Sequence, residues 1–281
     1  MGNEPEVGQY RDIRGIRTNI HDVGRAGGEP VLLLHGSGPG VTAFANWRLA
    51  IPHFARGRRV IAPDLLGFGY TDHRHGADYR IEHWIDHLVG LLDELEIERA
   101  AVVGNSFGGA LALHLALRHP ERVSRVALMG SVGTRFELTP GLDAVWGYTP
   151  SVDNMRQLID IFSYDASRFP ADLAELRYRA SIRPGAPEAF GEIFPAPRQR
   201  WIDALALSDE ELRSLKQELL IIHGREDRVI PVASSIALSG LIENAQLHVF
   251  SHCGHWVQLE QHERFHRLVE EFLEEQDRLS S

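Results

Sequence analysis

Apolar residues in this chain form short continuous runs, separated by segments in which apolar and polar positions follow helical spacing. The runs are rich in valine, isoleucine and leucine, and they occupy residues 31–34, 59–63, 100–104, 123–130, 218–224 and 246–250. Continuous apolar runs of this length are typical of strands that are buried on both faces of a parallel sheet. The pattern therefore predicts a mostly parallel sheet.

Helical patterns lie between several of these runs. Within residues 80–97, seven apolar residues recur at the spacing of a helix with one buried face, namely Ile81, Trp84, Ile85, Leu88, Leu91, Leu92 and Leu95. A second helix is predicted from Phe107 to about Arg118, because Pro120 disfavours its continuation. Strands that alternate with helices indicate an α/β fold.

Residues 136–207 depart from this alternation. They contain helical patterns at 154–162, 171–181 and 198–205, which are separated by connectors that contain proline, and they include no convincing strand. We interpret this segment as a helical insertion between two strands of the sheet. The predicted core then consists of residues 1–135 and 208–281.

Composition narrows the class of protein. The 281 residues carry a net charge of -10, which disfavours nucleic acid or an anionic membrane as a partner. A single cysteine, Cys253, rules out a disulfide within the chain. The polar N-terminus lacks the apolar stretch of a signal peptide, and no apolar run approaches the length of a membrane span. We therefore expect a cytoplasmic protein.

One short motif suggests catalysis. Ser106 lies between Gly104 and Gly108, after a predicted strand and before a predicted helix. This is the pattern of a nucleophile elbow, a sharp turn that presents a serine hydroxyl above a sheet, with glycines where side chains would collide. The alternative is a glycine-rich turn that only packs a helix onto the sheet.

A serine nucleophile needs a base, and the base needs an orienting acid. Asp227 is the candidate acid because it follows the run 218–224, with Glu226 as its nearest rival. Among the later histidines, His248 lies in a predicted strand, while His262 and His266 lie in a predicted helix. The loop 251–256 remains, and there His255 is preferred to His252 as the base.

A metal site is the alternative for this loop. His252, Cys253 and His255 are possible ligands, but no further ligands cluster near them in the sequence and Ser106 would be left unexplained. We therefore predict a site without a metal.

Acyl transfer also requires donors for a developing oxyanion. The backbone N–H of Phe107, at the predicted helix start, is one candidate, and that of Ser37, in the loop HGSGPG, is the other. This loop lacks the lysine of a phosphate-binding P-loop, and its glycines do not match the spacing of a dinucleotide-binding loop.

At this point the chain resembles the α/β hydrolases, and within them the meta-cleavage product hydrolases, over nearly its whole length. The motifs are HGSGPGVTAFANWR, APDLLGFGYTD, GNSFGGALALHLAL, AVWGYTPS, PRQRWIDAL, IIHGREDRVIP and CGHWVQLE. They look most like the 2-hydroxymuconic semialdehyde hydrolases. The resemblance implies an eight-stranded, mostly parallel sheet with a helical lid inserted after the sixth strand.

The resemblance also implies substrate contacts. Asn46, Asn105, Arg177 and Trp256 stand at the positions that bind the dienoate end of the substrate in the family. Arg179 is an alternative to Arg177, since the lid is the hardest region to align. Asn46 could instead cap a helix that begins near Trp47.

The implied reaction has two stages. A dienol is first converted to its ketone, and water then cleaves the carbon–carbon bond next to the carbonyl, by a serine acyl-enzyme or a gem-diol. The resemblance implies no cofactor, a small dienoate as the ligand and a possible homo-oligomer. A serine carboxylesterase of the same fold is the nearest alternative function. A non-catalytic receptor is more remote because Ser106, Asp227 and His255 are all present.

Overall fold

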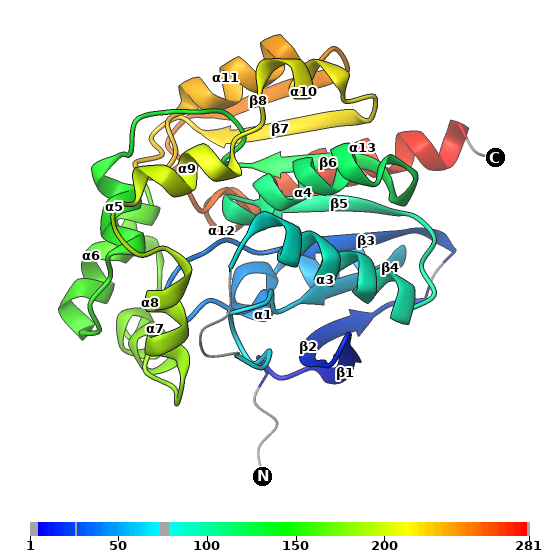
Figure 1. The fold of residues 1–281 in the computed structure, drawn as a ribbon. Helices are drawn as coiled ribbons and strands as arrows, with labels where there is room; N and C mark the ends of the chain where they lie inside the picture. Colours follow the sequence, from blue (N-terminus) through cyan, green and yellow to red (C-terminus); the bar gives the residue numbers. More distant parts are fainter. Residues whose placement is uncertain (1–4, 26, 74–78, 280–281) are drawn as a thin grey trace.

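The computed structural model describes residues 5–25, 27–73 and 79–279, with side chains up to residue 274. At its centre is an eight-stranded sheet in the order β1-β2-β4-β3-β5-β6-β7-β8 (Figure 1). The strands are β1 (Gln9–Ile13), β2 (Ile16–Val23), β3 (Gly28–Leu34), β4 (Arg58–Pro63), β5 (Ala100–Asn105), β6 (Val123–Met129), β7 (Glu218–Gly224) and β8 (Ala245–Phe250).

Strands β3 to β8 are parallel to one another, and β1 and β2 join one edge of the sheet in antiparallel pairings. The six apolar runs correspond to the six parallel strands, so the prediction of a mostly parallel sheet is confirmed. β1 and β2 have mixed buried and exposed positions and several charged residues. That composition is expected of antiparallel strands with one face toward solvent, and it leaves no continuous apolar run.

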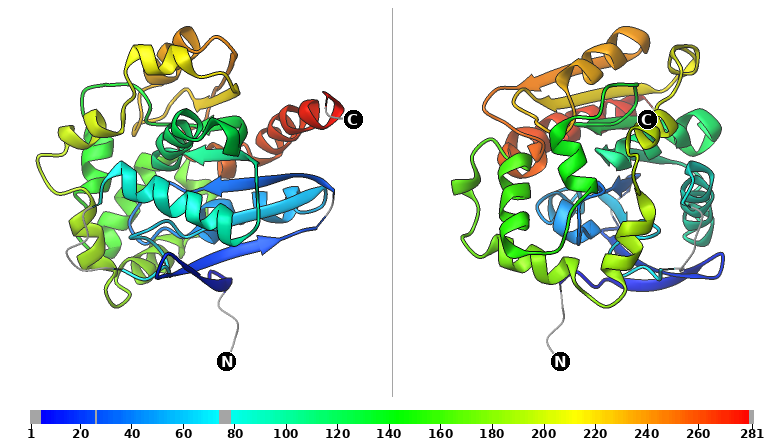
Figure 2. Two further views of the ribbon diagram at one scale, coloured as in Figure 1. Left: turned by 45° about the vertical axis from the view of Figure 1, so that its right-hand side comes forward. Right: turned by 60° about the vertical axis from the view of Figure 1, so that its left-hand side comes forward.

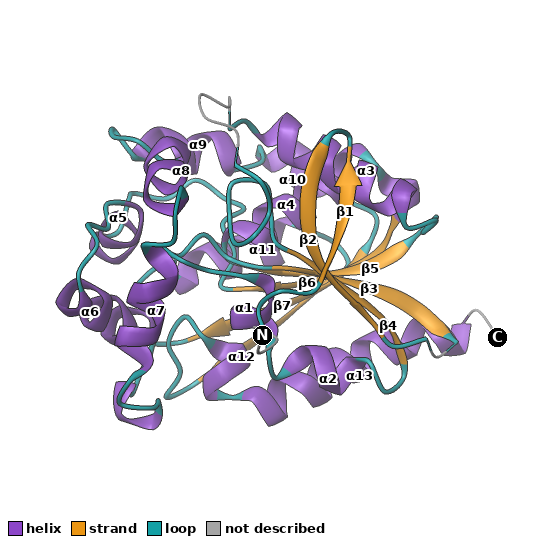
Figure 3. Ribbon diagram, turned by 90° about the horizontal axis from the view of Figure 1, so that it is seen from below, coloured by secondary structure: helices purple, strands orange, loops and turns teal. Residues whose placement is uncertain are grey.

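Helices cover both faces of the sheet (Figure 3). One face is covered by α3 (Ile81–Glu94), α4 (Phe107–Arg118), α10 (Asp209–Ser214) and α11 (Val232–Leu241), and the other by α1 (Ala43–Trp47), α2 (Ala50–Phe54) and α13 (His262–Leu279). Successive strand residues serve opposite cores: Leu32 packs on the α3 side, and Leu33 packs on the α13 side. The short elements η1 (Pro120–Arg122) and α12 (Val257–Glu260) complete this part.

Residues 136–207, all of which are described, form helices and no strand between β6 and β7. These helices are α5 (Pro140–Trp146), α6 (Val152–Phe162), η2 (Ala166–Arg168), α7 (Leu173–Ser181), α8 (Ala186–Ile193) and α9 (Gln199–Leu205). The two ends of the segment meet where the backbone N–H of Leu207 donates to the carbonyl of Gly133 at 3.1 Å. The sequence analysis singled out α6, α7 and α9, whereas α5 and α8 are additional.

The inserted helices gather at one end of the sheet, on the side where the parallel strands finish (Figures 1 and 2). The carboxyl ends of parallel strands are where open α/β sheets bind ligands. The inserted helices lie at this end of the sheet, and their role as a lid remains a prediction. Over the described ranges, no helix is both long and apolar enough to cross a membrane.

Candidate active site

Ser106 occupies the sharp turn between β5 and α4, with φ 54° and ψ -114°. This backbone conformation is strained for a residue with a side chain and marks the turn as a built feature. A Cβ on Gly104 would lie 2.5 Å from the carbonyl oxygen of Gly108, and one on Gly108 would lie 2.3 Å from that of Leu34. The two glycines are therefore required by the close approach of α4 to the sheet, as the elbow pattern predicts.

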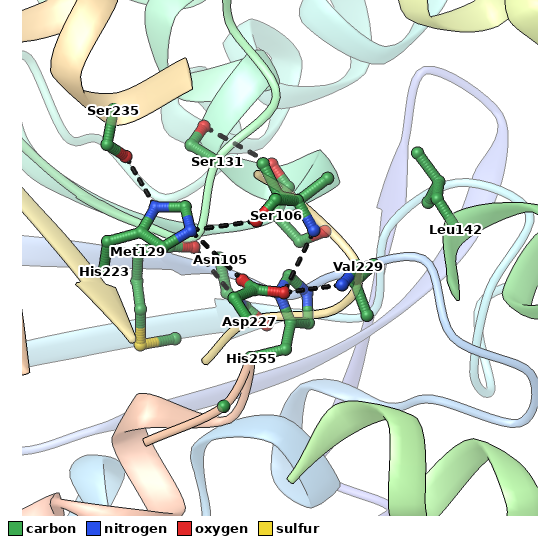
Figure 4. Close-up of polar contacts among 12 residues, drawn as sticks. Asn105, Ser106, Met129, Ser131, Leu142, His223, Asp227, Val229, Ser235 and His255 are labelled. Atoms are coloured by element: carbon green, nitrogen blue, oxygen red, sulfur yellow. Dashed lines mark hydrogen bonds and ion pairs between the residues drawn. The ribbon is translucent and has the colours of Figure 1, made fainter. Parts of the chain in front are cut away.

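The side chains of Asp227 and His255 lie next to each other at the same end of the sheet (Figure 4). Asp227 follows β7 and His255 follows β8, and His255 Nδ1–H donates to Asp227 Oδ2 at 2.7 Å. This bond fixes the ring so that Nε2 is left to act as a base. Gly130, with φ 51°, allows the pair to sit against β6, because a Cβ there would lie 3.0 Å from His255 Nδ1.

The Asp227 carboxylate is held on both of its oxygens. Oδ1 accepts the backbone N–H groups of Val229 (2.7 Å) and Ile230 (3.0 Å), and His223 Nε2 lies 3.4 Å from Oδ2. Burial by itself would raise the pKa of this carboxyl, but the facing His255 and His223 outweigh burial and hold the pKa of Asp227 well below its usual range. Asp227 therefore remains an anion. His223 lies inside β7, where no sequence pattern distinguishes it from the other strand residues.

The two rival residues have other partners. Glu226 Oε2 accepts the backbone N–H of Cys253 at 3.0 Å, so this carboxylate supports the backbone of the histidine loop. His252 is exposed, has φ 54°, and packs its ring against Tyr164. Neither residue is therefore part of the pairing that involves Asp227.

Ser106 and His255 both line a cavity of about 580 Å³ with mostly apolar walls. Both are nearly buried, at 5% and 3% exposure. In the described part of the chain, no hydrogen bond joins the Ser106 hydroxyl to His255; such contacts are often loose in enzymes without substrate. The cavity receives side chains from the strand ends and from the inserted helices, including Leu142, Met155, Phe162 and Leu173.

Ser37 lines the same cavity in the loop after β3. Its hydroxyl accepts a hydrogen bond from Trp146 Nε1 on α5 at 2.9 Å, which ties the loop to the inserted helices. The His35 ring links this loop to the segment after β4. Its Nδ1–H donates to the Gly36 carbonyl at 2.7 Å, and its Nε2 accepts Leu65 N–H at 2.9 Å. The backbone N–H of Ser37 remains a predicted oxyanion donor.

Phe107, the second predicted donor, is the first residue of α4 and is fully buried. Its ring contacts those of Phe68, Trp84 and Phe194. The side chain is therefore committed to the core, and only the backbone N–H, at the positive end of the helix, is available for an oxyanion.

All four predicted substrate contacts line the cavity that also contains Ser106. Asn46 lies inside α1, whose N-cap is Thr42, so the alternative that Asn46 caps a helix is wrong. Its buried Nδ2 has no hydrogen-bond partner among the described residues. Asn105 Nδ2 donates to the Met129 carbonyl at 3.1 Å, and the Trp256 ring stacks on that of Phe162.

Arg177, the fourth, lies on α7 and lines the cavity with its side chain 13% exposed. Its Nη1 donates to Glu6 at 3.1 Å and its Nη2 donates to the Gly40 carbonyl. Burial lowers the pKa of Arg177, and Glu6 opposes that effect. The alternative, Arg179, is 74% exposed and pairs with Glu175 on the same helix, which favours Arg177 as the residue that meets a ligand.

The C-terminal end of α6 is bonded to the histidine loop. The Phe162 carbonyl accepts the backbone N–H groups of His255 (2.7 Å) and Trp256 (3.2 Å). The Glu260 carboxylate accepts N–H groups from Gly254 and Tyr164, at 2.7 and 2.8 Å. Glu260 was not predicted from the sequence, because an acidic residue in a short helix such as α12 carries no distinguishing pattern.

The described residues contain no group of three or more His, Cys, Asp or Glu side chains arranged to hold a metal ion. Cys253 is a buried free thiol, and burial raises its pKa above the usual range. The assignment of His255 in this loop as the base for Ser106 remains a prediction.

Comparison with known proteins gives consistent results. A family model described as alpha/beta hydrolase fold matches residues 29–261. The chain is 60% identical over 272 residues to a 2-hydroxy-6-oxo-2,4-heptadienoate hydrolase of Pseudomonas putida strain F1, covering 97% of this chain and 98% of the relative. It is 58% identical to a 2-hydroxymuconate semialdehyde hydrolase of Pseudomonas sp. strain CF600, covering 98% and 96%.

A solved structure is also very similar. The meta-cleavage product hydrolase from Pseudomonas fluorescens IP01 superposes with a TM-score of 0.94 at 58% identity, covering 96% of this chain and 98% of that one. The likeness in sequence and in structure thus extends over nearly the whole chain, including the inserted helices.

Proposed function

This chain belongs to the α/β-hydrolase family and, within it, to the meta-cleavage product hydrolases, which hydrolyse a carbon–carbon bond in ring-fission products of catechols. On that premise we propose that its substrate is 2-hydroxymuconic semialdehyde or 2-hydroxy-6-oxohepta-2,4-dienoate, and that Ser106, His255 and Asp227 carry out the reaction. The observation that supports this most is the 2.7 Å bond between Asp227 and His255 at a cavity that also contains the strained Ser106.

In the first stage the dienol becomes a ketone. A proton leaves the 2-hydroxyl oxygen and a proton is added at C5, which gives a 2-oxo-3-enoate with no net change in atoms. His255 moves protons in this step, because Asp227 stabilises the imidazolium that forms. Ketonisation is needed because the 2-carbonyl then serves as the electron sink for the carbon that leaves.

In the second stage water cleaves the C5–C6 bond. Ser106 attacks C6 itself, or it activates the water that does, with His255 accepting the proton. The N–H groups of Ser37 and Phe107 stabilise the oxyanion on C6. The C5–C6 electron pair moves toward the 2-oxo group and releases 2-hydroxypenta-2,4-dienoate, while C6 leaves as formate or acetate with the oxygen of water.

The substrate's dienoate end lies against the polar residues of the cavity in this proposal. Arg177 binds the carboxylate, because a guanidinium matches a carboxylate in charge and geometry. Asn46, Asn105 and Trp256 line the path between that end and Ser106, and the unpartnered Nδ2 of Asn46 supports this placement. Residues 136–207 act as the lid, and no cofactor or metal takes part.

The test is loss of the yellow colour of the ring-fission product. Purified protein bleaches the substrate, and Ser106→Ala and His255→Ala each lower kcat by about a thousandfold or more. His252→Ala is the matched control in the same loop and keeps nearly full activity. Bleaching by Ser106→Ala at the original rate would contradict the assignment of the nucleophile.

The remaining proposals concern the setting of the enzyme. Its ligand is a small molecule, and the net charge of -10 supports an enzyme that does not bind nucleic acid. The buried free thiol of Cys253 is compatible with a cytoplasmic location. A homo-oligomer is a further proposal, which sedimentation at micromolar concentration tests directly.

A further inference from the structure

Positive charge is concentrated in one part of the cavity wall. Arg48, Arg177 and Arg183 line the cavity together with a single carboxylate of similar depth, that of Glu6. Asp172 and Arg179 also line it, but both are exposed to solvent. Buried Asp64 does not line the cavity, but it is close enough to Arg183 for their charges to interact. Among the partly buried side chains of the wall itself, positive charge therefore exceeds negative charge.

Arg177 and Arg48, two of the three partly buried arginines, have protein acceptors for terminal guanidinium nitrogens. Arg177 donates to Glu6 through Nη1 and to the Gly40 carbonyl through Nη2. Arg48 Nη1 donates to the Ala45 carbonyl at 3.1 Å. Arg177 therefore already uses two of its five N–H donors, and a ligand can bind the remaining ones or displace Glu6.

Arg183, in the connection between α7 and α8, differs from these two. Its Nε donates to the Ala180 carbonyl at 3.1 Å, and the centre of its guanidinium lies 3.6 Å from the centroid of the Tyr70 ring. Its Nη1 is buried and has no hydrogen-bond partner among the described residues. Two contacts thus orient the Arg183 guanidinium, while its Nη1 has no acceptor. A buried charged donor without an acceptor destabilises the fold unless a ligand supplies one.

The surroundings of Arg183 favour an anionic ligand. Tyr70, on which it stacks, also lines the cavity, so the guanidinium lies at the cavity wall. Arg183 and Arg177 are close enough for like charges to interact, and this repulsion helps to lower the pKa of Arg177, after burial as the main cause. A carboxylate between the two groups would remove the repulsion and supply the missing acceptor.

We propose that Arg183 is a second carboxylate-binding residue, which holds the dienoate carboxylate through Nη1 while Arg177 binds it from the other side. The inference rests on the proposed function for the identity of the substrate, but the site itself requires only a carboxylate. Two guanidinium groups from different segments fix the rotation of a planar carboxylate better than one does. The carboxylate would then define how far the dienoate extends toward Ser106.

The experiment compares Arg183→Gln and Arg183→Lys with Arg179→Gln, an exposed arginine of the same region that serves as the control. For the ring-fission product, KM rises about tenfold in Arg183→Gln, the loss of one charge-assisted hydrogen bond. Arg183→Lys keeps the charge without the planar group and shows a smaller rise of about threefold. Arg179→Gln stays within about twofold, as expected of an exposed pair.

Two further measurements separate binding from folding and from the assigned reaction. The kcat/KM for 4-nitrophenyl acetate, a neutral ester, should not differ between wild type and Arg183→Gln, whereas a folding defect would lower it. Hexa-2,4-dienoate, titrated by calorimetry, tests carboxylate binding without any turnover and should bind Arg183→Gln about tenfold more weakly.

An unchanged affinity for hexa-2,4-dienoate in Arg183→Gln would overturn the proposal. An equal loss of affinity in Arg179→Gln would also overturn it, because that result would indicate only general electrostatic attraction. If the protein bleaches no ring-fission product but hexa-2,4-dienoate binding still depends on Arg183, the proposed function fails and the carboxylate site stands.

Discussion

Glu6 and Arg177 are separated by 171 positions in the sequence, yet Arg177 Nη1 donates to Glu6 Oε1 at 3.1 Å inside the cavity. Both side chains are mostly buried, at 17% and 13% exposure. The Glu6 backbone is fixed as well, since its carbonyl accepts Asn19 Nδ2 at 3.0 Å. A carboxylate of the chain thus takes up one donor of the arginine that we assign to the substrate carboxylate, and a ligand that approaches the same N–H group competes with it.

Glu6→Gln should therefore lower KM for the dienoate. If Glu6 holds Arg177 for about nine-tenths of the time, removing its charge strengthens apparent binding by up to about tenfold. Steady-state kinetics on the ring-fission product measure this change, with Glu175→Gln, in the exposed pair with Arg179, as the control. A rise in KM would show instead that Glu6 orients Arg177 for the substrate.

Asp227→Asn should remove most of the activity while leaving binding intact. An amide can still touch His255, but it cannot stabilise the imidazolium or enforce the correct tautomer, so kcat falls by about a thousandfold or more. Glu226→Gln is the adjacent control: its carbonyl can still accept Cys253 N–H, and kcat stays within about threefold. The assignment is wrong if the larger loss occurs in the Glu226 variant.

Gly108→Ala should destabilise the fold at the elbow. The added methyl would lie 2.3 Å from the Leu34 carbonyl oxygen and 2.6 Å from that of His35, both of which are backbone atoms. We expect the free energy of unfolding to fall by about 3 kcal/mol or more.

Gly240→Ala is the control for this substitution. This glycine is exposed on α11 with nothing within 4 Å of an added Cβ, so alanine should raise stability by about 0.5 kcal/mol or more through its better helix propensity. Urea unfolding of both variants checks the two signs. Equal stability in the two would contradict the steric account of the elbow.

The parts of the fold that could be predicted depend on local patterns. The parallel strands β3 to β7 are mostly buried on both faces, so each appears as an apolar run, and α4 runs from Phe107 to Arg118 as expected. The parallel strand β8 at the sheet edge is largely exposed, although it also contains apolar residues. The antiparallel strands β1 and β2 carry no such run and entered the prediction only through resemblance to a family. In the inserted segment, α5 and α8 are short and begin beside Pro140 and Pro187, residues that also mark connectors.

The residues of the candidate site also differ in whether a local sequence pattern predicts them. Ser106 has a motif around it, and Asp227 and His255 follow strands in the expected order. Glu6 and Arg183 have no local signal, because their importance comes from contacts with Arg177 and Tyr70, which are distant in the sequence. Such pairings depend on how the N-terminal segment and the inserted helices meet, and a single sequence does not specify that.

Acid stability should depend on His35, which supports the loop that carries Ser37. Burial lowers the pKa of His35 to about 4, from an ordinary value near 6.5. Both ring nitrogens are already used in the neutral form, with Nε2 accepting Leu65 N–H, so a second proton would break that bond. The folded protein therefore resists protonation at a site that the unfolded chain protonates freely.

The sign of the effect follows from proton binding. Between about pH 6.5 and pH 4 the unfolded state binds more protons at this residue than the folded state does, so the stability that neutral His35 contributes is present above 6.5 and is lost as the pH falls. The loss amounts to about 3 kcal/mol for this one residue.

Urea titrations at pH 7.5, 6, 5 and 4.5 should show the decline in the free energy of unfolding. His35→Gln should lower stability at pH 7.5 but flatten the decline, whereas His248→Gln, at an exposed position on β8, should leave the slope unchanged. An unchanged slope in the His35 variant would mean that another group, such as buried His87 or His114, whose pKa values burial also lowers to about 4, dominates the acid response.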